Sequence, residues 1–129
     1  MGLVRIINEL VVSNVAGSVK FYVDNFSFTM DVSEGNPMLW ARLKNGSSLL
    51  MLEDYDSAKM EMPDFPEKTK SSNLLMLEYD NSGEVANLYE DLARKGVKFF
   101  KDYEETDYGK VEFGVYDLDG NMILVSAAI

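Results

Sequence analysis

The sequence predicts a small α+β domain made of two similar halves, each with a strand, an amphipathic helix and further strands. Aliphatic and β-branched residues of 3–12 and 73–79 each precede a segment with apolar residues at helical spacing. An offset of 66 residues places Gly17 on Gly83, and the order of elements repeats with it. At 129 residues and 47% hydrophobic content, the chain is long enough for one domain with a continuous core.

The first half, about residues 1–54, begins with a strand over Leu3 to Val12. Ser13 and Asn14 can cap a following helix. The apolar stripe of that helix consists of Val15, Val19, Tyr22, Val23 and Phe26. Strands at 38–43 and 47–53 flank Asn45-Gly46, a pair typical of hairpin turns. Residues of about 55–72 are acidic and lysine-rich with little periodicity, which predicts a connector.

The second half, about residues 73–129, contains the best-marked helix. Asn81 and Glu84 have the spacing of a capping box, and Gly96 suits the left-handed position after a helix. Strands are expected at 97–101, 111–116 and 122–127. The segment 117–121 predicts a hairpin turn rather than a calcium loop, since calcium-loop spacing would place Val115 and Ser126 at ligand positions.

Charge and composition exclude several classes of function. Twelve basic and 22 acidic residues give a net charge of -10, which opposes binding to nucleic acid. No apolar run is long enough to span a bilayer, and no secretory signal is expected. The sequence has no cysteine, which suits the cytoplasm, and no histidine, so an ordinary transition-metal site lacks its usual ligands. The acidity indicates solubility, or a field that attracts cationic ligands.

Three short motifs, in order, carry a resemblance to a known family. They are 10–14 (LVVSN), 18–22 (SVKFY) and 117–121 (DLDGN). Together they resemble the vicinal oxygen chelate superfamily of glyoxalases, bleomycin-resistance proteins and extradiol dioxygenases. Asn14 and Leu118 stand where that family typically has aspartate and proline. The resemblance implies paired βαβββ modules whose mixed sheet curves around a cavity, usually in a homodimer.

The resemblance also implies where metal ligands would stand in the metal-dependent members. These ligands stand on the first, fourth, fifth and eighth strands of the fold. The positions on the first, fifth and eighth strands correspond to Ile7, Asn73 and Leu124, and the position on the fourth strand falls near Leu50 or Leu52. Aliphatic side chains have no lone pair to offer a cation. We therefore expect neither the metal of the family nor any other cofactor.

Several carboxylates remain as chemical candidates. A register slip of two residues would bring Glu9 inward in place of Ile7, and Glu53 lies near the position on the fourth strand. Two carboxylates alone, however, make a weak cation site. Glu9, Glu78 and Glu112 interrupt apolar strands and could act as bases if burial raised the pKa of one of them. The alternative, which we favour for each, is the solvent side of an alternating strand.

Aromatic residues gather in segments that would line the cavity or its mouth in this fold. Strands are expected to carry Trp40, Phe113 and Tyr116. The connector contains Tyr55 and Phe65, and a late loop contains Tyr103 and Tyr108. Aromatic walls beside carboxylates suit flat or cationic ligands. Core packing is the alternative, favoured for Phe113 and Tyr116. We select Glu9, Trp40, Phe65, Tyr103, Tyr108 and Phe113 as candidate ligand-binding residues.

The leading hypothesis is a metal-independent binding protein, similar to bleomycin-resistance proteins, that sequesters a cationic or aromatic compound such as a glycopeptide antibiotic at a dimer groove. The alternative is an enzyme of the same superfamily, a lyase, isomerase or dioxygenase with relocated metal ligands or with a glutamate base, for which Glu9 is the candidate. A third is a dimeric sensor or partner protein.

Overall fold

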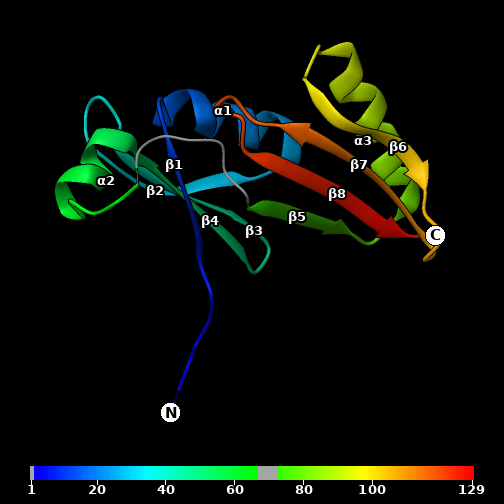
Figure 1. Ribbon diagram of the computed structural model, residues 1–129, viewed down its shortest axis with the longest axis horizontal. Helices are drawn as coiled ribbons and strands as arrows, with labels where there is room; N and C mark the ends of the chain where they lie inside the picture. Colours follow the sequence, from blue (N-terminus) through cyan, green and yellow to red (C-terminus); the bar gives the residue numbers. More distant parts are fainter. Residues whose placement is uncertain (1, 67–72) are drawn as a thin grey trace. The chain divides into compact units, whose positions relative to one another are not determined.

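The chain folds into two compact units, Met1–Thr69 and Lys70–Ile129 (Figure 1). The computed structural model describes residues 2–66 and 73–129. Within those residues it contains eight strands, in two four-stranded mixed sheets, and three helices. No helix in this part of the chain is both long and apolar enough to cross a membrane.

The two units share one topology. The first contains β1 (Asn8–Val12), α1 (Val15–Phe26), β2 (Thr29–Glu34), β3 (Trp40–Asn45), β4 (Ser48–Asp54) and α2 (Tyr55–Glu61). The second contains β5 (Leu74–Tyr79), α3 (Ser82–Arg94), β6 (Phe99–Glu105), β7 (Lys110–Tyr116) and β8 (Met122–Ala128). The strand orders are β1-β4-β3-β2 and β5-β8-β7-β6. In each sheet the first pair is parallel and the others antiparallel, so the prediction of two βαβββ modules is confirmed.

Asparagine side chains start the two long helices, as the sequence predicts. The Asn14 side chain accepts a hydrogen bond from the Gly17 N–H at 3.0 Å. The Asn81 side chain accepts from the Gly83 and Glu84 N–H groups at 2.7 and 3.2 Å. Such caps satisfy backbone donors that have no partner within the helix. Gly96 follows α3 with a φ of 75°, which is the expected left-handed conformation.

The core of the first unit lies between α1 and one face of its sheet. On this face lie the side chains of Leu43, Leu50 and Leu52, which are fully buried together with Tyr22 and Phe26 of α1. Side chains alternate between the two faces along a strand. The residues next to these leucines on β3 and β4 therefore point to the opposite face, which α1 does not cover.

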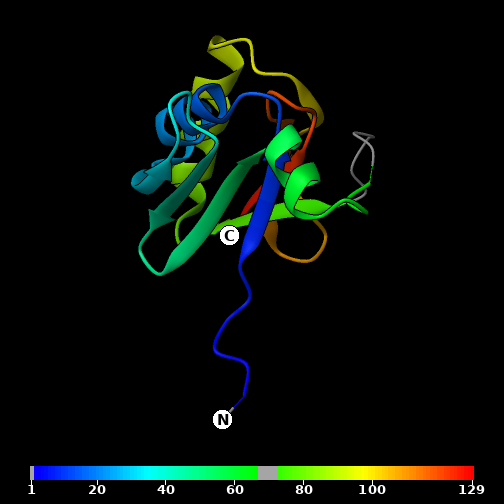
Figure 2. The ribbon, with the colours of Figure 1, turned by 90° about the vertical axis from the view of Figure 1, so that its left-hand side faces the viewer.

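The segment predicted as an irregular connector contains α2. Asp54 caps this helix by accepting a hydrogen bond from the Ser57 N–H at 3.1 Å. Ala58 is its one buried residue, so the helix has almost no apolar stripe from which periodicity could predict it. In Figure 2 the green helix α2 lies beside the blue strand β1, and it contacts both β1 and β4. It thereby closes one side of the uncovered face.

The core of the second unit lies between α3 and its sheet. Val85 and Leu92 of the helix are fully buried, as are Phe113, Val115 and Ile123 of the strands. An aromatic cluster continues this core, with the Tyr89 ring centroid 5.3 Å from Phe99, 5.4 Å from Tyr103 and 5.6 Å from Phe113. Such edge and tilted pairs stabilise a core beyond their buried area.

Candidate functional site

A cavity of about 630 Å³ opens on the sheet face of the first unit that α1 leaves uncovered. Residues of all four strands of this sheet, of α2 and of the segment between β2 and β3 line it. They are Glu9, Glu34, Gly35, Leu39, Trp40, Glu53, Ser57, Glu61 and Met62. We call this cavity the acidic pocket, because four of its nine lining residues are glutamates.

Strand register places Glu9, Trp40 and Glu53 on the same face. Trp40 is the antiparallel partner of Glu53, and Glu9 pairs in parallel with Met51, two residues before Glu53. Because side chains alternate along a strand, Leu50 and Leu52 point to the other face, under α1. The expectation that the inward position of the fourth strand lies near Leu50 or Leu52 is therefore wrong, and Glu53 stands on the open face instead.

Glu9 and Trp40 are joined directly. The indole Nε1–H of Trp40 donates a hydrogen bond to Glu9 Oε1 at 3.2 Å. This bond connects β1 to β3 across β4 and holds the indole in the wall of the pocket. Two residues selected from the sequence, 31 positions apart, thus lie in one site. Trp40 is also the sole tryptophan of the chain, so its fluorescence reports on this pocket alone.

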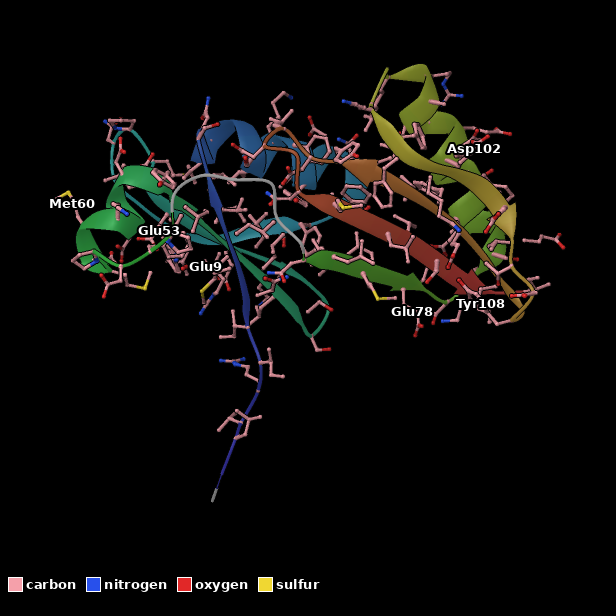
Figure 3. All side chains as sticks on the ribbon, in the orientation of Figure 1. Glu9, Glu53, Met60, Glu78, Asp102 and Tyr108 are labelled. Atoms are coloured by element: carbon pink, nitrogen blue, oxygen red, sulfur yellow. The ribbon has the colours of Figure 1, made fainter. Side chains whose placement is uncertain are left out.

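Glu53 is the buried carboxylate of the site, with 4% of its surface exposed. Its Oε2 accepts a hydrogen bond from Ser57 Oγ at 3.3 Å, and Figure 3 shows it close to Glu9 beside α2. Burial, followed by the charges of Glu9 and Glu61 and hydrogen bonds with both, raises the pKa of Glu53 to about 7. Glu53 therefore carries a proton for much of the time at neutral pH.

The rim between β2 and β3 depends on Gly35. Its φ of 94° lies in the region that favours glycine, and a Cβ there would meet the Pro37 carbonyl oxygen at 2.7 Å. Backbone bonds hold this rim, since the Leu39 N–H donates to Glu34 O and the Asp54 N–H donates to Leu39 O, each at 2.8 Å. The pocket edge is thus built on tightly constrained backbone.

The chemistry of the acidic pocket favours an organic cation. Its described lining includes no lysine or arginine. Arg42, which shares the open face of β3, is engaged by Asp31 Oδ2 at 2.9 Å. An indole, Leu39 and Met62 supply apolar surface next to the carboxylates. Carboxylates together with an aromatic wall bind a positively charged aromatic group through charge, hydrogen bonding and stacking.

The residues present do not fit the metal implied by the fold. Ile7 and Asn73 directly precede β1 and β5, and Leu124 lies on β8, so two aliphatic chains and one amide occupy three of the expected ligand positions. Across residues 2–66 and 73–129, no group of three or more histidine, cysteine, aspartate or glutamate side chains has an arrangement that could hold a metal ion. We derive no chemistry through a metal here.

Phe65 does not line the pocket. Its backbone carbonyl accepts a hydrogen bond from Lys59 Nζ at 2.7 Å, and its N–H donates to Met62 O at 2.8 Å. Phe65 therefore helps to hold the segment that follows α2. Alternation and aromaticity could not identify Ser57 and Glu61 as pocket residues, because α2 brings them there.

The remaining aromatic candidates lie in the second unit. Phe113 is fully buried in the core, so its selection as a ligand-binding residue is corrected. Tyr103 lies on β6 rather than in a loop and packs on Tyr89. Tyr108 is 62% exposed, and its hydroxyl donates to Glu112 Oε1 at 2.5 Å (Figure 3).

The two other strand glutamates differ in their surroundings. Glu112 is 4% exposed and lies 3.1 Å from Lys101 Nζ, so it is not on the solvent side as favoured above. Glu78 is exposed, as expected, and pairs with Lys110 at 2.9 Å. That bond lowers the pKa of Glu78, which does not suit a base at neutral pH.

The segment 117–121 is a hairpin turn, as predicted. Asp117 Oδ1 accepts hydrogen bonds from the Asp119 and Asn121 N–H groups at 2.9 and 2.8 Å. Asp117 Oδ2 accepts from Asn121 Nδ2 at 2.9 Å. Both carboxylate oxygens are thus used within the turn, which connects β7 to β8.

Comparison with known proteins agrees with this architecture. Residues 3–125 match the family model described as Glyoxalase/Bleomycin resistance protein/Dioxygenase superfamily. The fold is similar to that of a glyoxalase-related enzyme from Fulvimarina pelagi, with a TM-score of 0.83 and 17% identity over 97% of this chain and 88% of the other. A lactoylglutathione lyase from Agrobacterium tumefaciens aligns with a TM-score of 0.76 and 17% identity, covering 95% and 92%. TioX from Micromonospora sp. ML1 aligns with a TM-score of 0.71 and 15% identity, over 96% of this chain and 98% of TioX. No curated protein sequence matches.

Proposed function

Because this chain belongs to the Glyoxalase/Bleomycin resistance protein/Dioxygenase superfamily, we propose that it is a metal-independent binding protein for a cationic aromatic compound. The acidic pocket carries the proposal. Its carboxylates can neutralise a cation, and the Trp40 indole offers a surface on which a ring can stack. A net charge of -10 would also attract such a compound toward the protein.

The biological role that follows is sequestration. A protein that binds a toxic compound tightly lowers its free concentration without chemical change, so no metal or cofactor is needed. We also propose that the protein is a cytoplasmic homodimer and that it binds the compound at a groove between the two copies, as the family resemblance implies. Light scattering coupled to size-exclusion chromatography measures the number of copies, and a monomer would remove the dimer from the proposal.

A titration monitored by Trp40 fluorescence tests the binding. Proflavine, a planar aromatic cation, should quench this emission with a saturable 1:1 curve, whereas the aromatic anion anilinonaphthalene sulfonate should not. N-acetyltryptophanamide corrects for collisional quenching. Glu78→Gln is the matched control, because this exposed carboxylate lies outside the pocket and should leave binding unchanged.

Two results would contradict the proposal. One is the absence of saturable binding by proflavine and other aromatic cations, both in fluorescence and in calorimetry. The other is equal binding of the anion, since four glutamates should repel it. Sequestration as the end point requires in addition that the compound be recovered chemically unchanged after incubation with the protein.

One observation favours a second candidate, an enzyme that uses a glutamate base. A pKa of about 7 for Glu53 is close to the ideal value for a general acid or base at neutral pH, and the carboxyl group faces a cavity. In this second candidate we assign the role of base to Glu53, whereas the sequence suggested Glu9. Conversion of a bound compound that stops in Glu53→Gln, with binding retained, would support an isomerase or lyase instead of sequestration.

A further inference from the structure

We propose that the acidic pocket selects cations by their N–H donors, taking amidinium, guanidinium or primary ammonium groups in preference to quaternary ammonium. The inference deepens the proposed function and rests on it. It concerns which chemical feature of a cation this particular arrangement of carboxylates recognises.

Glu9 and Glu61 line the acidic pocket together with the buried Glu53, so three carboxylates share one wall of the cavity. Ionised carboxylates only accept hydrogen bonds, so a contact between two of them needs a proton on one. The protein supplies two further donors, Ser57 Oγ to Glu53 Oε2 at 3.3 Å and Trp40 Nε1 to Glu9 Oε1 at 3.2 Å. A proton on Glu53, which its raised pKa favours, adds a third donor among these carboxylates.

A ligand that neutralises these carboxylates must supply hydrogen bonds as well as charge. An amidinium or guanidinium group presents several N–H donors in one plane and can bridge two carboxylates, taking the place of the proton. A quaternary ammonium group has no N–H, so when the proton departs the buried carboxylate of Glu53 loses one donor and keeps that from Ser57 Oγ. Leaving buried acceptors unsatisfied is costly, which makes N–H the discriminating feature.

All the charged side chains in the described lining of the pocket are carboxylates, so they act on Glu53 in the same direction. Glu9 comes from β1 and Glu61 from α2, while Glu34 lines the pocket from the end of β2. The β3 neighbour is Trp40, which is uncharged, and the α2 neighbour is Ser57. The raised pKa of Glu53 agrees with this geometry, because a cation that replaces the proton should release it to solvent.

Isothermal titration calorimetry of the full-length protein tests the inference with two matched probes, benzamidine and benzyltrimethylammonium. Both carry one aromatic ring and one permanent positive charge at neutral pH, but only benzamidine has N–H donors. We expect benzamidine to bind at least tenfold more tightly. Repeating the titration in phosphate and MOPS buffers, which differ in ionisation enthalpy and carry no primary ammonium group, measures proton release, which should be about half a proton at pH 7. Its affinity should be about tenfold higher at pH 8 than at pH 6.

Glu53→Gln separates selection from simple attraction. Glutamine keeps the shape of the protonated carboxyl but cannot become an anion, so benzamidine should lose its advantage and its proton release. Glu78→Gln should retain both. Far-ultraviolet circular dichroism establishes that each variant is folded.

The remaining outcomes of these titrations overturn either this inference or the proposed function. Equal affinity for the two probes, or tighter binding of benzamidine without proton release, overturns the inference while leaving the proposed function in place if proflavine binds. Failure of benzamidine where proflavine binds overturns it as well. If neither probe nor proflavine binds, the proposed function itself fails.

Discussion

Replacing Glu53 by glutamine should stabilise the protein at alkaline pH. Glu53 is almost fully buried, and its folded-state pKa of about 7 compares with 4.5 in the unfolded chain. The folded protein therefore binds more protons than the unfolded chain between these two values. Stability falls as the pH rises through this window, and the full cost of ionising Glu53 is present above pH 7.

The magnitude follows from the two pKa values. Their difference corresponds to about 3 kcal/mol of unfolding free energy above pH 7, and to almost nothing below pH 4.5. Glutamine can still accept from Ser57 Oγ and donate from its amide, so it mimics the protonated carboxyl. Glu53→Gln should thus gain up to about 3 kcal/mol at pH 8 and little at pH 5.

Urea denaturation of both proteins at pH 5, 6, 7 and 8 measures this gain, with folding followed by circular dichroism. Glu78→Gln is the control, because Glu78 is exposed and its pKa is lowered by Lys110, so no gain at high pH is expected. A gain from Glu53→Gln that did not vary with pH, or a loss at pH 8, would refute the assignment of a raised pKa to the buried carboxyl group of Glu53.

Four further outcomes are expected. Trp40→Phe, which loses the indole N–H bond to Glu9, should weaken proflavine binding by about tenfold in calorimetry; unchanged affinity would count against the pocket. Gly114→Ala should cost about 1–3 kcal/mol in urea denaturation, because its Cβ would overlap the Phe100 ring; a neutral effect would show that the ring moves freely. Asn81→Ala should cost about 1 kcal/mol through loss of the α3 cap, against no loss if water replaces it. Elemental analysis of the purified protein should find no stoichiometric metal, and a tightly held ion would redirect attention to relocated ligands.

Local patterns were sufficient for most of the fold. Capping residues and apolar spacing predict α1 and α3, while alternation and turn residues predict the hairpins. Strand β2 was not predicted, although Met30 and Val32 alternate with polar residues along it; both side chains are exposed in the structure, so this alternation marks no buried face. Strand β6 extends past the predicted end, where register shifts between Phe99 and Glu104 interrupt the pattern and place Tyr103 on the strand.

The candidate site was predictable only in part. Glu9 and Trp40 were selected as a carboxylate in an apolar strand and an aromatic residue on a strand, and they line the same pocket. Phe113 was selected on the same kind of signal, yet it lies in the core. The difference is which face of its strand each residue occupies. Aromatic character alone does not report the face.

By itself the sequence determined the repeated order of strand, helix and strands, the helix starts at Asn14 and Asn81, and the acidity of the whole chain. These properties depend on residues close together along the chain. Only the tertiary structure decided that Glu53 faces the pocket, and that α2 places Glu61 and Ser57 beside it. Strand register and helix packing bring these distant residues together, and the burial that follows raises the pKa of Glu53, because a charged carboxylate is costly away from water.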